Sequence, residues 1–144
     1  MAIAHIRALK SDGLSHPRKI RVLIADDHEL VREGLVNLLD LHSDIEVVGE
    51  ASDGEEAIRI SRELNPDVVL MDISMPKMDG IEATKIIHKE LPHIRIIALS
   101  MHDADVHANQ MVKHGAFAYC SKIGSADNLI ATIKEASTMG NTHS

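Results

Sequence analysis

One stretch, residues 66–80, constrains the fold of this chain more than any other. Four apolar residues (68–71) lead directly into a carboxylate, Asp72, and a loop with proline and glycine follows. A short continuous apolar run between turn signals is typical of a strand that is buried on both faces of a sheet. Asp72 then lies at or just past the carboxyl end of that strand, where open parallel α/β sheets place their ligand sites. We therefore expect Asp72 to carry the chemistry of this protein.

Strands and helices alternate along the rest of the chain. Gly115 suits a helix C-cap, and Pro66 ends a helix because proline disfavours helical geometry in the residue before it. Five strands that alternate with five helices imply right-handed parallel crossovers, and hence a three-layer α/β sandwich. The predicted strands are 20–25, 45–49, 67–71, 94–99 and 116–120, and the predicted helices are 30–41, 57–64, 81–90, 103–113 and 125–138.

This pattern predicts one domain over residues 19–139. A chain of 144 residues is long enough for a single domain with a sizeable core. Residues 1–18 contain turn and linker signals, and we expect them to form a flexible N-terminal extension. Residues 140–144 are expected to be a C-terminal tail or the start of a linker.

The charge balance argues against nucleic-acid binding by this chain. Lysine and arginine number 15 and aspartate and glutamate number 22, a net charge of −7, whereas nucleic-acid binding normally needs a basic face. The single cysteine, Cys120, excludes an intrachain disulfide and fits a reducing compartment. No apolar run approaches the ~20 residues of a membrane span, and the first residues do not resemble a signal peptide. We therefore expect a cytoplasmic protein that does not bind membranes.

The ten histidines raise the alternative of a zinc site. His88 and His93 are five residues apart, as are His102 and His107, whereas two zinc ligands on one helix face are four apart. No Cys-x-x-Cys pair accompanies them. Their spacing therefore favours solvated surface histidines.

Chemically active side chains follow four of the five predicted strands. Because all strands of a parallel sheet end at the same edge, we expect these side chains to lie together. Clustered carboxylates repel one another unless a cation sits among them, and oxygen ligands suit a hard ion such as Mg²⁺. The residues are Asp26 and Asp27 after the first strand, Asp72 after the third, Ser100 after the fourth and Lys122 after the fifth.

This edge is suited to a phosphoryl group. A bound Mg²⁺ leaves positions for phosphoryl oxygens, Lys122 can neutralise another oxygen, and Ser100 can donate a hydrogen bond. Asp72 is then a carboxylate nucleophile that forms an aspartyl phosphate. The plainer alternatives are a helix N-cap for the two neighbouring aspartates, a turn role for the serine and a solvated lysine. Each signal is weak alone, but their convergence on one edge favours the site.

Several segments together resemble a response-regulator receiver domain of the CheY-like kind. The motifs are most similar to the NarL/FixJ (LuxR-type) subfamily, and the resemblance covers about residues 19–139. It implies a flavodoxin-like (βα)5 sandwich with a five-stranded parallel sheet in the order 2-1-3-4-5. The segments that carry it are residues 22–28, 66–80, 98–100 and 115–122.

The resemblance also implies a metal site. Asp72 matches the phosphoacceptor and Asp27 matches the acid that binds Mg²⁺ directly, with Asp26 acting through water. The family's third protein ligand is a backbone carbonyl two residues past the acceptor, here that of Ser74.

Further roles follow from the resemblance. Ser100 matches the switch hydroxyl, Lys122 the family's lysine, and Tyr119 the aromatic residue that turns inward on activation; an ordinary half-buried strand position is the alternative for Tyr119. Phosphorylation adds about −1.5 to −2 charges, which is expected to draw Ser100 inward and vacate space for Tyr119. Ser74 and His102 flank the phosphoryl group in the family and are expected to tune the dephosphorylation rate.

The implied function is a phosphoacceptor in bacterial two-component signalling. A sensor histidine kinase is the expected phosphoryl donor and Mg²⁺ the expected cofactor, with no turnover of a substrate beyond autodephosphorylation. Such regulators usually carry a C-terminal helix-turn-helix domain, which this chain does not include. That domain is either removed or naturally absent, and the linker-like ending favours the first. A homodimer is compatible with the resemblance, but no residue decides it.

Three other functions are less compatible with the sequence. A haloacid-dehalogenase-like phosphatase would have a second aspartate where this chain has Ser74, so its general acid is missing. A stand-alone or degenerate receiver that acts as a protein-interaction module is disfavoured because every acidic, hydroxyl and lysine position is filled. A Rossmann dinucleotide site would need a glycine-rich turn after the first strand.

Overall fold

The structure is a computed structural model that describes residues 18–101, 106–122 and 124–142. It consists of strands and helices that alternate along the whole described chain. In chain order they are β1 (Ile20–Ala25), α2 (Glu29–Asp40), β2 (Ile45–Ala51), α3 (Gly54–Leu64), β3 (Val68–Asp72), α4 (Gly80–Glu90), β4 (Arg95–Ser100), α5 (Val106–Lys113), β5 (Ala118–Ser121) and α6 (Ala126–Thr142).

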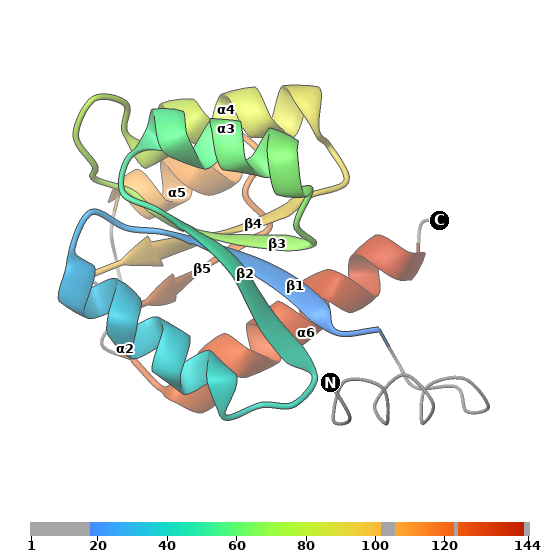
Figure 1. The fold of residues 1–144 in the computed structure, drawn as a ribbon. Helices are drawn as coiled ribbons and strands as arrows, with labels where there is room; N and C mark the ends of the chain where they lie inside the picture. The colour runs from blue at the N-terminus through green and yellow to red at the C-terminus, as the bar shows by residue number, and fades with distance from the viewer. Residues whose placement is uncertain (1–17, 102–105, 123, 143–144) are drawn as a thin grey trace.

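The strands form one parallel sheet in the order β2-β1-β3-β4-β5. Helices α3, α4 and α5 cover one face of the sheet, and α2 and α6 cover the other (Figure 1). This is the predicted three-layer sandwich with the strand order that the family resemblance implies. All strand carboxyl ends therefore meet at a single edge.

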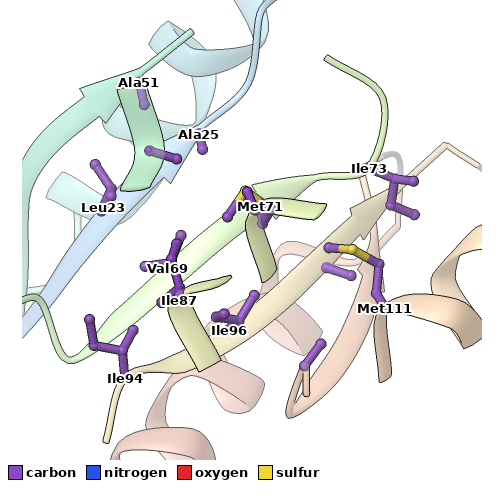
Figure 2. Packing of buried hydrophobic residues seen from close by; sticks show 14 of the residues in the cluster. Leu23, Ala25, Ala51, Val69, Met71, Ile73, Ile87, Ile94, Ile96 and Met111 are labelled. Atoms are coloured by element: carbon purple, nitrogen blue, oxygen red, sulfur yellow. The ribbon is translucent and has the colours of Figure 1, made fainter. Parts of the chain in front are cut away.

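The central strand β3 is buried on both faces. Val69 and Met71 belong to the hydrophobic cluster beneath α3, α4 and α5, part of which Figure 2 shows. Val68 and Leu70 belong to a second cluster that packs against α2 and α6. Because alternate residues of a strand point to opposite faces, an apolar residue is needed at every position, which explains the continuous run in the sequence. The last residue of this strand, Asp72, breaks the apolar pattern.

Two helix ends form where the sequence predicted them. After α5, the N–H groups of Gly115 and Ala116 donate to the carbonyls of Val112 and Met111. With Gly115 at φ 123°, these bonds make the Schellman pattern for which glycine is favoured. After α3, Asn65 adopts the left-handed conformation directly before Pro66.

Some predicted boundaries were wrong by a few residues. Strand β2 continues to Ala51 and β5 begins at Ala118, because pairing with β1 and β4 sets their extent. Helix α6 runs to Thr142, past the predicted end near Thr138, since one interior glycine costs only about 1 kcal/mol in a helix. Residues 140–142 are therefore helical. Among the described residues, no helix is long and apolar enough to cross a membrane.

Candidate functional site

The first part of the site is the loop after β1. Asp26 is completely buried, and its N–H donates to the carbonyl of Ala51 at 2.9 Å, which continues the pairing of β1 with β2. The side chain of Asp27 is about one-third exposed. The N-cap of α2 is His28 and neither of the two aspartates. Helix capping by the aspartates, the plainer alternative, is therefore wrong.

Lys122 joins this loop to β3. Its ammonium lies 2.8 Å from Asp26 Oδ2 and 3.0 Å from Asp72 Oδ1, and its side chain is only 5% exposed. The backbone N–H of Lys122 donates to the Ser100 carbonyl at 2.7 Å, which fixes the loop after β5 against the end of β4. The alternative of a solvated lysine is therefore wrong. One cation connects two carboxylates from different strands.

The loop after Asp72 turns back tightly against the strand. The N–H of Gly80 donates to the carbonyl of Ile73 at 2.8 Å. A Cβ added to Gly80 would lie 2.1 Å from the carbonyl oxygen of Asp72, so no larger residue fits without moving the loop. The exposed Ser74 lies within this turn. Glycine at position 80 thus allows the loop to stay close to the acceptor strand.

A pocket of about 240 Å³ lies at the edge of the sheet where these strands end. Ser100, the last residue of β4, is 2% exposed and lines it together with Asp72 and Lys122. Ser100 is therefore a buried strand residue and does not belong to a solvent-facing turn. The full lining is His28, Asp72, Ile73, Ser74, Leu99, Ser100, Met101 and Lys122.

The electrostatics of the site make Asp72 harder to ionise in the absence of another cation. Burial, reinforced by the nearby Asp26 charge, raises the pKa of Asp72 from 3.8 to about 6, although Lys122 and a backbone hydrogen bond from Ser74 lower it. Burial also disfavours the Lys122 ammonium, but both aspartates outweigh it and raise the pKa of the lysine. Among the described residues, Asp72 Oδ2 is buried and has no hydrogen-bond partner. A carboxylate oxygen without a partner needs a positive ligand.

The same cluster has the composition of a metal site. Asp26, Asp27, His28 and Asp72 each offer a ligand atom, and these atoms all lie within 4.8 Å of one another. Three carboxylates against the single ammonium of Lys122 leave a net charge of −2. A divalent cation would balance that charge and would supply a partner for Asp72 Oδ2. The residues present therefore fit a divalent metal ion.

Comparison with known proteins identifies the family. A family model described as the response regulator receiver domain matches residues 22–134, which is most of the chain. This chain is a response regulator receiver domain.

Similar proteins agree with that assignment. The transcriptional regulatory protein LiaR of Bacillus subtilis (strain 168) is 48% identical over 118 residues, which cover 82% of this chain and 56% of LiaR. The signal receiver domain of the response regulator NarL from Mycobacterium tuberculosis superposes with a TM-score of 0.79 at 35% identity, covering 85% of this chain and 98% of that one. A CheX–CheY–BeF3–Mg²⁺ complex from Borrelia burgdorferi matches with a TM-score of 0.74 at 26% identity over 82% of this chain and 89% of that one.

The match extends over only part of the relatives. This chain spans about half the length of the curated relatives it matches, 49% of DegU from Brevibacillus brevis and 56% of LiaR. Both relatives are transcriptional regulatory proteins. The chain therefore corresponds to the receiver domain of two-component response regulators.

The receiver domain also contains supporting residues that sequence reasoning missed. Arg32 on α2 donates to the carbonyl of Asp26 at 2.6 Å and to Glu50 Oε1 at 3.1 Å. It thereby links the loop that contains Asp26 and Asp27 to the end of β2. The end of this strand was predicted to contribute no residue to the site. His28 was likewise missed as part of the cluster. The only sequence signal for it is its place directly after the two aspartates.

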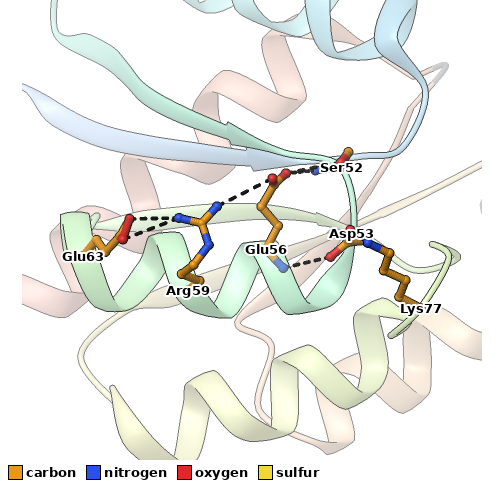
Figure 3. Close-up of polar contacts among 6 residues, drawn as sticks. All are labelled: Ser52, Asp53, Glu56, Arg59, Glu63 and Lys77. Atoms are coloured by element: carbon orange, nitrogen blue, oxygen red, sulfur yellow. Dashed lines mark hydrogen bonds and ion pairs between the residues drawn. The ribbon is translucent and has the colours of Figure 1, made fainter.

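A second support lies at the start of α3. Asp53 caps this helix by accepting the N–H of Glu56 at 2.8 Å, and its other oxygen lies 3.7 Å from Lys77 Nζ (Figure 3). Gly54 donates its N–H to the carbonyl of Met78 at 2.9 Å. Lys77 and Met78 belong to the loop that follows Asp72. Helix α3 thus anchors the loop that contains Ser74.

One residue that the sequence predicted for the site, Tyr119, lies away from the acidic cluster, and another lies outside the described residues. Tyr119 on β5 is 41% exposed. It pairs with Ala98 while Ser121 pairs with Ser100, so alternation places Tyr119 and Ser100 on the same face of the sheet. His102 lies outside the described residues.

Proposed function

We propose that this receiver domain accepts a phosphoryl group on Asp72 from a sensor histidine kinase. The observation that carries the proposal is the buried Oδ2 of Asp72, which has no hydrogen-bond partner among the described residues and lies beside Lys122 and Ser100 in a pocket at the edge of the sheet. A carboxylate oxygen in this environment is positioned as a nucleophile, and the surrounding groups complement a transferred phosphoryl group.

The transfer requires little covalent chemistry from the protein. A carboxylate oxygen of Asp72 attacks phosphorus, the bond between phosphorus and the donor nitrogen breaks, and the electron pair stays on the leaving imidazole. Lys122, whose ammonium is already 3.0 Å from Asp72 Oδ1, neutralises charge on the phosphoryl oxygens. The Ser100 hydroxyl donates a hydrogen bond to another of these oxygens.

Mg²⁺ is the cofactor that we propose for the acidic cluster. Asp27, Asp72 and the backbone carbonyl of Ser74 would hold it, with Asp26 acting through water. Asp26 Oδ1 accepts the His28 N–H at 2.8 Å, and Asp26 Oδ2 forms an ion pair with Lys122 at 2.8 Å, which fits an indirect role. When bound, Mg²⁺ supplies positive charge for the phosphoryl oxygens. The CheY complex, which contains both BeF3 and Mg²⁺, supports the proposal because a tetrahedral beryllium fluoride resembles a phosphoryl group in shape and charge.

The product is a stored signal that is reset by hydrolysis. We propose no turnover of a separate substrate beyond autodephosphorylation, and we propose that Ser74, which lines the pocket, influences the rate of that hydrolysis. Ser100 and Tyr119, on one face of neighbouring strands, form the proposed switch. Attraction of Ser100 toward the new phosphoryl oxygens would open space for Tyr119 to move inward.

The partners are proposed from the relatives. LiaR and DegU are transcriptional regulators, so we propose a cytoplasmic signalling protein whose output is a DNA-binding domain outside this chain. The net charge of −7 supports the proposal that the receiver domain itself does not bind DNA. Homodimerisation is a further proposal, which size-exclusion chromatography with and without phosphorylation would test. The degenerate, purely interacting receiver is not favoured because the acceptor, lysine and hydroxyl positions are all filled.

Intact-mass measurement tests the phosphoacceptor proposal. Incubation with acetyl phosphate and Mg²⁺ should add one phosphoryl group to the protein, and Asp72→Asn should abolish the addition because the nucleophile is lost. The matched control is Asp67→Asn, which removes a carboxylate from the opposite edge of the sheet, where it pairs with Arg18. An Asp72→Asn variant that is still phosphorylated to the same extent would refute the proposal.

A further inference from the structure

His28 occupies a helix position for which histidine is an unusual choice. It is the N-cap of α2, where serine, threonine, asparagine and aspartate are favoured because their side chains accept a backbone N–H. The His28 side chain makes no capping hydrogen bond. Its Nδ1 instead lies 3.2 Å from Asp26 Oδ1 and 3.2 Å from Asp27 Oδ1. Helix capping therefore does not explain the imidazole.

We propose that His28 Nδ1 is a direct ligand of the divalent cation in the acidic cluster. The nitrogen donor strengthens the preference of the site for borderline transition-metal ions, Ni²⁺ and Zn²⁺, beyond that of an all-oxygen site. This inference deepens the metal part of the proposed function and rests on it. It assigns a further ligand and a metal selectivity to the same site.

The distances fit a shared metal ion. In an octahedral complex with bonds of about 2.1 Å, adjacent donor atoms lie about 3 Å apart and opposite ones about 4.2 Å apart. The separation of 3.2 Å between His28 Nδ1 and Asp27 Oδ1 matches adjacent donors. The ligand atoms of the cluster, including that of the water-linked Asp26, all lie within 4.8 Å of one another, so they surround one place.

An independent observation points to a ligand at this place. Asp72 is 5% exposed, and its Oδ2 is buried without a hydrogen-bond partner among the described residues. Asp72 and His28 line the same pocket. The cluster is therefore more than a group of solvated surface acids, because a buried oxygen from the central strand completes it.

The donor chemistry determines the selectivity. Mg²⁺ prefers oxygen ligands and keeps several waters, so an imidazole adds little to its binding. Divalent affinity rises from Mn²⁺ through Ni²⁺ to Cu²⁺ at protein sites in general, and an imidazole ligand, which suits Ni²⁺ and Zn²⁺, makes that rise steeper. Ligation through Nδ1 requires the tautomer with its proton on Nε2. The His28 side chain is 64% exposed, so water can serve as the partner of that proton.

Metal titration of the unphosphorylated protein tests the assignment. Isothermal titration calorimetry at neutral pH would measure the Kd of Ni²⁺ and of Mg²⁺ for the unchanged protein, for His28→Ala and for His42→Ala. The side chain of His28 makes no capping hydrogen bond to α2 and alanine can make none, so the variant removes the imidazole without removing such a bond. His42 lies in the turn between α2 and β2, outside the cluster, and controls for adventitious binding to a histidine.

The inference predicts a change for one metal only. His28→Ala should raise the Kd of Ni²⁺ about tenfold or more, since loss of even an outer partner of a metal ligand costs about 10–100-fold, while the Kd of Mg²⁺ stays within about twofold. His42→Ala should change neither value. Equal weakening of both ions would overturn the inference, because it would show that the imidazole only orients the carboxylates. No change in either Kd would overturn it as well.

The outcome is separable from the proposed function. The titration needs no phosphoryl donor, whereas the mass experiment on Asp72 needs no Ni²⁺. Loss of Ni²⁺ preference in His28→Ala together with absence of phosphorylation would support the ligand assignment and refute the phosphoacceptor. Phosphorylation together with an unchanged Ni²⁺ preference in His28→Ala would support the phosphoacceptor and overturn the ligand assignment.

Discussion

The buried carboxylate of Asp72 destabilises the folded domain when it ionises without a bound cation. The proton binds more tightly in the folded state, where the pKa is about 6, than in the unfolded chain, where it is 3.8. The contribution of Asp72 is therefore most favourable below about pH 4 and is lost as the pH rises through 6. The difference between the two pKa values corresponds to a loss of about 3 kcal/mol in the free energy of unfolding at neutral pH.

Asp72→Asn should therefore stabilise the metal-free protein. We expect a gain of about 1–3 kcal/mol in the free energy of unfolding at neutral pH, because the amide never ionises while Lys122 keeps Asp26 as a partner. The gap should narrow as the pH falls toward 4 and close below about pH 3, where Asp72 is protonated in both states. Urea unfolding in a chelator at several pH values measures both effects. A variant that is less stable than the parent at neutral pH would show that ionised Asp72 is well accommodated without a metal.

Residue-level prediction from the sequence succeeded where a strand end determines a side chain's position. Asp26, Asp72, Ser100 and Lys122 were placed at one edge because each follows an apolar run, and the structure brings them to that edge. Hydrophobic periodicity carries no information on polar contacts between a helix side chain and a neighbouring loop. That is why the contact of Arg32 with the Asp26 carbonyl and the ring position of His28 were missed.

At the scale of elements, α3 and the loop after β3 depend on each other. A Cβ added to Gly54, the first residue of α3, would lie 2.3 Å from the carbonyl oxygen of Met78 and 2.9 Å from its Cβ. Gly54 also donates its N–H to that carbonyl. A Cβ added to Gly34, within α2, would have no atom within 4 Å beyond its chain neighbours and the adjacent backbone of its own helix. The two glycines therefore form a matched pair for testing the anchor.

Gly54→Ala should weaken both the fold and the metal site. We expect a loss of about 1–3 kcal/mol of stability from the overlap with Met78, and a higher Kd for Mg²⁺ because the displaced loop contains the proposed Ser74 ligand. Gly34→Ala should instead add about 0.5–1 kcal/mol, as alanine is the better helix former. Thermal unfolding and Mg²⁺ titration provide both measurements. An unchanged Mg²⁺ affinity in Gly54→Ala would show that α3 does not position the loop.

The type of each element was easier to predict than its ends. The five helices and five strands of the described residues follow from hydrophobic periodicity, and Gly115 and Asn65 end helices as their residue types indicate. The limits of β2 and β5 depend on pairing with neighbouring strands, which no local pattern contains. Helix α6 continued through Gly140 because a weak local preference does not by itself end a helix.

For the whole molecule, the proposed function requires that the site communicate with the surface. Ser100 is buried at the pocket and Tyr119 is 41% exposed, and both lie on one face of the adjacent strands β4 and β5. The chain contains one tyrosine and no tryptophan. Tyrosine fluorescence therefore reports on Tyr119 alone.

Ser100→Ala should separate phosphorylation from its consequence. In the unchanged protein, we expect phosphorylation to alter the emission of Tyr119 and its quenching by iodide, because the ring moves inward. In Ser100→Ala, intact mass should still show the added phosphoryl group, although at a lower rate, while the fluorescence change is lost. A fluorescence change of the same size in both proteins would argue against a role for the hydroxyl in the switch.

The central claim is that Asp72 is the residue that carries the phosphoryl group. The most direct measurement is borohydride reduction of the phosphorylated protein, which converts an aspartyl phosphate to homoserine, followed by peptide mass spectrometry. We expect homoserine at position 72, dependent on Mg²⁺, with Asp26 and Asp27 unmodified. Homoserine at either of those positions, or at none while the intact protein carries a phosphoryl group, would contradict it.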